Sequence, residues 1–377
     1  MKLTLAIPKT VPVARNFVSF VDPWLLAATA ALTLFGLVMV YSASATLARE
    51  AYQTQFHFVL RQFLAALVGC GLLVGGLWIG YPRLERSWVV YGLLGVAVGL
   101  LVLVLLLPPV RNTHRFIRLP GMMFQPSELA KPALVLFLAF FLSRKDALAR
   151  RDPFQTLLPA GLVTGVLAGL VFLGRDLGTV LILGGTAAAM LLVAGVPCRQ
   201  LAAAGLACAP LLLYAALKEP YRRARLLAFL DPWKAPREEG FQIIQSLLAI
   251  GSGGVSGVGL AQSRQKLFYL PEAHTDFIFS VIAEEIGLIG SLMVIGLFGV
   301  LLVRGLRAAY LASDEFGKLL AVGVTVLLVG QALFNLSVVL GLAPAKGIPL
   351  PFVSYGGSSL MMSLLATGWL LSVSRRT

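Results

Sequence analysis

The sequence predicts an all-α integral membrane protein with about ten transmembrane helices and one long extracytoplasmic loop between helices 7 and 8. The first observation is composition: 58% of the 377 residues are hydrophobic, 13% are charged, and the mean hydropathy is +0.87. These values lie outside the usual range for a soluble domain. The second observation is a series of long runs almost free of charge, since about 20 apolar residues cross the roughly 30 Å of bilayer hydrocarbon.

Ten runs meet this criterion, and together they predict one polytopic domain over residues 1–377. The fourth run is short, and we expect its helix to begin earlier in the chain. Tryptophans at predicted helix ends fit the preference of indole rings for the membrane interface. The predicted spans are 24–45, 58–79, 88–107, 129–143, 157–173, 177–196, 199–217, 277–303, 318–342 and 357–374.

The amino-terminal segment predicts a first helix that is retained. Lys2, Lys9 and Arg15 precede an apolar run that is longer than a signal-peptide core, and no Ala-x-Ala cleavage site follows it. We therefore expect the run to be a membrane span.

The formal charge of +14 arises from Lys and Arg scattered through short loops, which is not the pattern of a nucleic-acid-binding block. With the amino terminus inside, the short cytoplasmic loops hold more of these residues than the outer side, once the long 218–276 loop is set aside. The positive-inside rule then predicts that both termini are cytoplasmic. Arg111, Arg115 and Arg118 lie on the outer side against this rule, and binding of an anionic group would explain them.

The predicted extracytoplasmic loop, residues 218–276, is too long for a simple connection between helices. Within it, 241–250 has apolar residues at helical spacing beside Gln242 and Gln245, which predicts a short helix on the membrane surface. The glycine-rich stretch 251–260 matches neither the P-loop nor the dinucleotide fingerprint. Its backbone amides either approach a phosphate or form a flexible turn.

Charged side chains at membrane depth cost about 2.5–3.5 kcal/mol each on insertion scales, so they need partners or water. Glu128 and Lys131 open the fourth span at i, i+3 spacing, where they either form a self-satisfying ion pair or line a site. Asp176 precedes the sixth span as either a helix N-cap or a site residue. At least one of Glu284 and Glu285 should face a polar interior.

The segment 269–276 brings two carboxylates, Glu272 and Asp276, and the His274 imidazole to the outer mouth of the eighth span. His274 is either a hydrogen-bonded interfacial residue or part of a site. Thr275 and Asp276 are either an N-cap pair or catalytic groups. Periodicity does not choose between these interpretations.

Several long motifs then identify a family, because the chain closely resembles the SEDS (shape, elongation, division and sporulation) family of FtsW- and RodA-like membrane glycosyltransferases. The MVYSAS and SYGGSS sequences are more typical of its FtsW, or division, branch. Gly174-Arg175 departs from the Gln or Glu followed by Pro that the family often has before Asp176. The motifs are GLVMVYSAS at 36–44, FQPSELAK at 124–131, DLGT at 176–179, GFQIIQSLLAIGSGG at 240–254, QKLFYLPEAHTDFIFSVIAEE at 265–285 and KGIPLPFVSYGGSS at 346–359.

The resemblance implies polymerisation of lipid II into glycan strands at the outer face of a bacterial cytoplasmic membrane. An acceptor hydroxyl would attack an anomeric carbon with inversion, and undecaprenyl pyrophosphate would leave. Asp276 matches the family's essential aspartate and would be the general base. The resemblance and the charges together predict these substrate-binding residues: Arg115, Arg118, Glu128, Lys131, Asp176, Gln245, Glu272, His274, Lys346, Ser354 and Ser358.

The implied partners are lipid II, the undecaprenyl pyrophosphate-linked glycan, a class B penicillin-binding protein, and other divisome or elongasome membrane proteins. No dedicated cofactor or metal-ligand cluster is evident, although magnesium or another divalent cation could bridge the diphosphate. Two other functions fit a polytopic chain: a lipid II flippase and a non-catalytic scaffold. A flippase predicts charged residues through the bilayer midplane, whereas the polar groups here concentrate toward the outer mouth.

Overall fold

The computed structural model describes residues 21–110, 113–119, 122–218, 220–234, 236, 238, 240–266 and 270–375. The basic residues Lys2, Lys9 and Arg15 and the outer Arg111 lie outside these ranges, so the expectations attached to them stay predictions.

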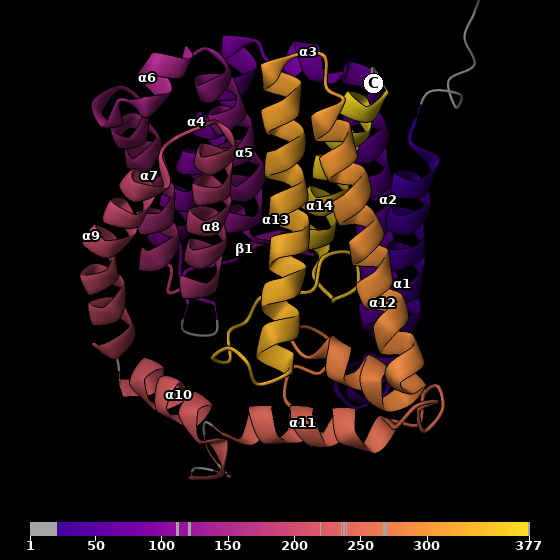
Figure 1. Ribbon diagram of the computed structural model, residues 1–377. Helices are drawn as coiled ribbons and strands as arrows, with labels where there is room; N and C mark the ends of the chain where they lie inside the picture. Colours follow the sequence, from indigo (N-terminus) through magenta and orange to yellow (C-terminus); the bar gives the residue numbers. More distant parts are fainter. Residues whose placement is uncertain are drawn as a thin grey trace, which may run out of the picture.

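Long helices form a bundle that follows the predicted spans (Figure 1). Within the described residues, eight helices are long and apolar enough to cross a membrane, one of them the continuous segment Pro153–Leu173. The seventeen-residue α8 is a shorter apolar helix. The prediction of an all-α integral membrane protein is confirmed. The bundle helices are α1 (Pro23–Tyr52), α2 (His57–Ile79), α4 (Ser87–Leu106), α5 (Pro126–Ser143), α7 (Leu158–Leu173), α8 (Leu177–Val193), α9 (Cys198–Leu217), α12 (Ile278–Tyr310), α13 (Glu315–Val339) and α14 (Gly357–Ser374).

The fourth predicted span does extend backwards, because α5 begins at Pro126, and proline suits the first turn of a helix, where its missing N–H costs nothing. Short elements connect the long helices. They are α3 (Tyr81–Leu84), α6 (Ala147–Arg151), the π-helix η1 (Pro153–Leu157) and an antiparallel hairpin of β1 (Ile117–Leu119) and β2 (Met122–Phe124).

The centre of the bundle is formed by α5, α13 and α14, which are mostly buried, whereas α4 and α7 expose most of their surface. Small residues let the helices approach closely: a Cβ atom added to Gly368 of α14 would lie 2.4 Å from the Leu73 carbonyl oxygen of α2. On α4, by contrast, Gly92, Gly95 and Gly99 face open space.

The long loop contains three helices: α10 (Pro220–Leu230), the 3₁₀ helix η2 (Pro232–Lys234) and α11 (Phe241–Gly253). Figure 1 shows α10 and α11 running across one end of the bundle. The helix predicted over 241–250 is therefore confirmed. On α11, the Ser246 hydroxyl donates to the Val339 carbonyl at 2.6 Å and lies 2.8 Å from the Ser280 hydroxyl, so α11 is fixed to α13 and α12.

The glycine-rich stretch 251–260 packs against a kink in α12. The amides of Val258 and Gly259 donate to the carbonyls of Glu284 and Glu285, each at 3.0 Å. Gly287 has φ +69°, and a Cβ atom there would lie 2.5 Å from the Gly257 nitrogen, so only glycine fits. These two amides bond to the protein itself, which favours a packed turn, and the phosphate-cradle interpretation stays a prediction.

Candidate functional site

Asp276 lies in the loop immediately before α12 and does not cap that helix. The N-cap residue is Phe277, and no side chain caps the first turn. The carboxylate is partly buried against the 340–356 loop, where a Cβ atom on Gly347 would lie 2.9 Å from Oδ2. The N-cap interpretation of Asp276 is therefore wrong, and its carboxylate is available for another role.

The main chain around Asp276 is held by polar side chains from elsewhere in the fold. Asn335 of α13 donates through Nδ2 to the carbonyls of Asp276 and Ile348, at 2.8 and 2.7 Å. The Ser354 hydroxyl donates to the Thr275 carbonyl at 2.6 Å. These bonds fix the two loops against each other, so the position of the Asp276 carboxylate is set by the frame of the bundle.

The surroundings raise the pKa of Asp276 from its ordinary value to about 7. Burial is the largest cause, since it disfavours the charged form, and the negative charges of Glu272 and Asp176 act in the same direction. Arg115 and Arg225 oppose this effect by favouring the carboxylate. A carboxylate with a pKa near 7 can accept a proton from a hydroxyl and release it again near neutral pH.

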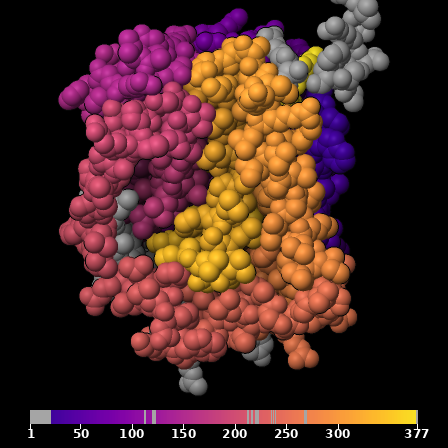
Figure 2. Space-filling model, in the orientation of Figure 1, coloured from indigo at the N-terminus to yellow at the C-terminus, as the bar shows by residue number. Residues whose placement is uncertain are grey.

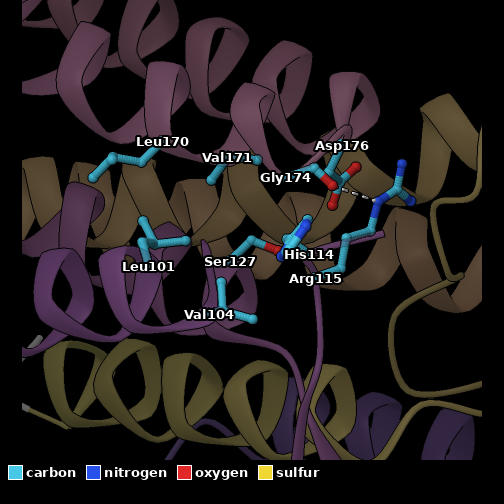
Figure 3. A pocket seen from close by; sticks show the side chains of 9 residues that line it. All are labelled: Leu101, Val104, His114, Arg115, Ser127, Leu170, Val171, Gly174 and Asp176. Atoms are coloured by element: carbon cyan, nitrogen blue, oxygen red, sulfur yellow. Dashed lines mark hydrogen bonds between the residues drawn. The ribbon is translucent and has the colours of Figure 1, made fainter. Parts of the chain in front are cut away.

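Arg115 connects the hairpin segment to the turn before α8. Its Nε donates to the Gly174 carbonyl at 3.4 Å, and one terminal guanidinium nitrogen donates to the Arg175 carbonyl. Figure 3 shows the contact between Arg115 and Gly174 at the edge of a small pocket that Ser127 and Asp176 also line. A guanidinium has five N–H groups, so Arg115 retains donors for an anion. Arg118, on β1, is exposed.

Asp176 is the N-cap of α8, as one of the two interpretations predicts. It accepts from the Thr179 amide at 3.2 Å and the Thr179 hydroxyl at 2.9 Å, and Gln125 donates to it at 3.1 Å. These bonds involve both carboxylate oxygens of a buried side chain. A direct contact between Asp176 and substrate stays a prediction, but its negative charge does act on Asp276.

Glu128 and Lys131 form a buried ion pair at 2.7 Å, so each charge has its partner inside the bundle, as one of the two interpretations predicts. A chain of hydrogen bonds extends from this pair. Lys131 donates to Gln331 Oε1 at 2.7 Å, and Gln331 Nε2 donates to the Pro349 carbonyl at 2.8 Å. The pair is thereby linked to the loop that carries Gly347 beside Asp276.

Glu284 and Glu285 are both buried, and both face polar partners. Glu285 pairs with Lys266 at 2.8 Å and accepts from the Ser42 hydroxyl at 2.7 Å. Glu284 accepts from the Ser263 hydroxyl and from the Arg264 amide. The expectation that at least one faces a polar interior is confirmed for both side chains.

The other candidates lie around the same end of the bundle, in different settings. The His274 ring packs on Phe58, with 4.9 Å between ring centroids, and both interpretations of this residue stay predictions. Glu272 is exposed and accepts from the Thr275 hydroxyl at 3.1 Å. The remaining three are a buried Ser358 on α14, a half-buried Lys346 beside Gly347, and a half-buried Gln245 on α11. Ser354 holds the loops through its hydroxyl, and its substrate contact stays a prediction.

Sequence reasoning overlooked the neutral amides and one arginine. Gln62, Gln331 and Asn335 are buried in otherwise apolar helices and hold the loops of the site. A polar amide at membrane depth requires partners, and this signal could have found them. Arg225, on α10, was hidden among the other arginines of its helix.

Among the described residues, no group of three or more His, Cys, Asp or Glu side chains could hold a metal ion. Magnesium or another divalent cation as a bridge to a diphosphate stays a prediction.

The fold and site define a polytopic membrane protein with a carboxylate of raised pKa, Asp276, at one end of the bundle and the guanidinium charges of Arg115 and Arg225 acting on it. Its sequence matches the profile of the FtsW, RodA and SpoVE family, described as cell cycle proteins, over residues 23–377, and the chain belongs to this family.

Relatives and solved structures agree with this assignment. The chain is 44% identical to the probable peptidoglycan glycosyltransferase FtsW of Geobacter metallireducens, over 94% of this chain and 95% of the relative. It is 42% identical to stage V sporulation protein E of Bacillus subtilis, over 94% and 97%.

Two solved structures share the fold. One, from a peptidoglycan synthase complex that coordinates polymerisation and crosslinking, has a TM-score of 0.77 and 33% identity, covering 96% of this chain and 99% of that chain. Thermus thermophilus RodA has a TM-score of 0.69 and 29% identity, covering 96% and 98%.

Proposed function

We propose that this protein is a peptidoglycan glycosyltransferase that polymerises lipid II. The observation that carries the proposal is Asp276: a carboxylate with a pKa of about 7 that caps no helix and is held by main-chain contacts in a protein of this family. Family membership alone would not distinguish an enzyme from a flippase or a scaffold. A positioned base supports chemistry.

The reaction needs one proton acceptor and one anion-stabilising group. Ionised Asp276 takes the proton from the acceptor sugar hydroxyl as its oxygen attacks the anomeric carbon of the donor. The bond from that carbon to the pyrophosphate oxygen breaks, and undecaprenyl pyrophosphate leaves with inversion. Arg115 stabilises the developing negative charge through its remaining donors. Arg225 adds positive charge near the same carboxylate.

The lipid tails require lateral access to the site. Figure 2 shows one face hollowed between α9, α10 and the C-terminal part of the chain, which supports entry of a lipid-linked sugar from the bilayer at this face. Purified protein with labelled lipid II should produce glycan polymers on a gel. A flippase would instead move lipid II across liposomes without polymer, and a scaffold would do neither.

Localisation and partnership belong to the same proposal. We place the protein in the bacterial cytoplasmic membrane, with both termini cytoplasmic and with Asp276 outside. A class B penicillin-binding protein would crosslink the strands, and other divisome or elongasome membrane proteins would join this pair. The similar chain from a complex that couples polymerisation to crosslinking supports such a partner.

The topology can be tested with a reporter fused after Thr377, which should report a cytoplasmic position. In a background without the three free cysteines Cys70, Cys198 and Cys208, Lys234→Cys should react with an impermeant thiol reagent from outside, since Lys234 is exposed on the long loop. The opposite labelling would also contradict the mechanism, because Asp276 would face the cytoplasm.

The pH dependence of polymerisation should follow the ionisation of Asp276. The raised pKa means that the base is protonated below about pH 7, so the rate should rise with pH through that value. Glu272→Gln removes a neighbouring negative charge that raises this pKa, and should move the rise to lower pH. Glu238→Gln, a change at another exposed carboxylate of the outer loop, should leave the profile in place. Identical profiles for all three proteins would contradict this assignment.

Arg115→Ala should lower kcat/KM for lipid II by roughly 10- to 100-fold, because hydrogen bonds to charged groups contribute about 1.5–3 kcal/mol. Arg115→Lys should recover part of the loss, since it keeps the charge without the planar fork. Arg223→Ala, at an exposed arginine of α10, is the matched control. Unchanged kinetics in a well-folded Arg115→Ala protein would remove this residue from the site.

A further inference from the structure

A group of aromatic rings lies where α1 ends and α2 begins, next to the loop that carries Asp276. Tyr52 and His57 stack with ring centroids 3.6 Å apart and planes 4° from parallel. We call the set the aromatic group. Its members Tyr52, His57, Phe58, His274 and Tyr355 contact one another, and it also includes Phe56, next to His57 in the chain, whose ring stacks on Tyr41 with centroids 5.7 Å apart.

Two members belong to the catalytic loops. The His274 ring lies 4.9 Å from Phe58 and 5.6 Å from Tyr355, measured between ring centroids. The Tyr355 amide donates to the His274 carbonyl at 3.0 Å, two residues before Asp276. The aromatic group is therefore continuous with the proposed active site. In Figure 1, α1 and α2 lie on one side of α14, and β1 and α8 lie on the other side. The Arg115 guanidinium binds the turn that precedes α8.

Exposure and polarity distinguish this surface from an ordinary membrane anchor. Tyr52 and Phe56 are 49% and 54% exposed, so ring surface is available beside the site. Interfacial anchors such as Trp24 and Trp88 are single exposed rings, and no ring contact joins either to another aromatic side chain among the described residues. In the aromatic group each ring packs on another aromatic ring, Phe56 on Tyr41 and the others among themselves.

The aromatic group also has polar atoms that can form hydrogen bonds with the hydroxyl and amide groups of a ligand. His57 Nε2 is buried and has no hydrogen-bond partner among the described residues. Burial raises the pKa of the Tyr355 phenol, and the adjacent Arg61 guanidinium, which hydrogen-bonds it, opposes that effect. Apart from the neighbouring Arg61, the group carries no permanent charge. Exposed ring faces with polar edges suit a neutral ligand whose rings have one apolar face and many hydroxyls.

From this geometry we infer that the aromatic group binds the saccharide chain of the lipid-linked substrate, as a subsite for N-acetylated, β-1,4-linked hexosamine rings. The inference rests on the proposed function, and it adds the part of the substrate that Arg115 and Asp276 do not recognise. The aromatic group holds the neutral sugar chain on one side of Asp276, and Arg115 attracts the pyrophosphate on the other side. A strand held by its sugars stays bound between successive additions.

The test uses a ligand that has neither lipid nor pyrophosphate, the β-1,4-linked tetrasaccharide of N-acetylglucosamine. It is titrated into purified protein in nanodiscs, and binding is followed by saturation-transfer NMR. Wild-type protein should bind with saturation. Tyr52→Ala and Phe56→Leu should each weaken binding by about 2- to 10-fold, the range expected for loss of one aromatic contact. Both side chains are about half exposed, so the folded bundle should tolerate the changes.

Phe63→Leu is the matched control, since Phe63 is 46% exposed on α2 and makes no ring contact among the described residues. It should bind the tetrasaccharide as wild-type protein does. In polymerisation assays Tyr52→Ala and Phe56→Leu should also give shorter strands than Phe63→Leu. Absence of saturable binding to wild-type protein, or equal affinity in all four proteins, would overturn the inference.

The same titration on Asp276→Asn separates this inference from the proposed function. Tetrasaccharide binding should persist in that variant, because the aromatic group is intact. If wild-type protein binds the sugar but never polymerises lipid II, the proposed reaction fails and the saccharide site stands. If it polymerises lipid II and ring substitutions leave sugar affinity unchanged, the saccharide site fails and the reaction stands.

Discussion

Asp276→Asn is expected to reduce glycan polymerisation by about 10²–10⁴-fold, the usual contribution of a positioned general base. The amide keeps the shape of the side chain but cannot accept a proton from a sugar hydroxyl near neutral pH. Asp276 caps no helix, Asn335 holds its carbonyl, and Ser354 holds the carbonyl of the preceding Thr275, so the fold should survive the change. Polymer formation from labelled lipid II and lipid II binding should be measured on the same preparation.

The decisive pattern is loss of polymer with retained binding. Asp276→Glu is a useful companion, because it keeps a base but displaces the carboxylate by one methylene from its present position beside Gly347. It should recover only part of the activity. Robust polymerisation by clean Asp276→Asn protein would show that another group takes the proton, and Glu272, which lies near enough to raise the pKa of Asp276, would be examined next.

Lys131→Met should have the largest effect on stability, about 3–5 kcal/mol, because it leaves the Glu128 carboxylate buried without its partner. It also removes the donor to Gln331, whose other end holds the Pro349 carbonyl beside the site. Thermal unfolding in detergent should show the loss directly.

The double variant Glu128→Gln, Lys131→Met separates the two interpretations of this pair. It removes both charges, so most of the stability should return. Polymerisation should stay low, because the link from α5 through Gln331 to the catalytic loop is still missing. Full activity in the double variant would mean that the pair only satisfies itself inside the membrane and makes no contribution to the reaction.

Most of the fold could be predicted from the sequence, because each span is a local property of the chain. A run of apolar residues must be helical to satisfy its backbone in lipid, and this requirement applies wherever the run lies. The backward extension of α5 to Pro126 and the short helix at Phe241–Gly253 were predicted for similar local reasons.

The site could be predicted only in part, because its frame depends on contacts between distant residues. Gln62 donates to the Ser354 carbonyl from a position 292 residues away, and Asn335 binds Asp276 across 59 residues. Nothing in the local pattern distinguishes an N-cap aspartate from a catalytic one. Asp176 and Asp276 both precede helices, yet only Asp176 caps its helix, and the structure of each first turn was needed to separate them.

The packing of the glycine-rich stretch against α12 has a consequence for the motions of the outer end of the bundle. Glycines usually mark the parts of a chain that move most freely, but Gly257 and Gly287 here remove the space that movement would require. Residues 253–259 and the first turns of α12 are joined by several main-chain bonds. They should therefore move as one rigid body, so that any displacement of the long loop is transmitted along α12 toward the opposite end of the bundle without being absorbed at the turn.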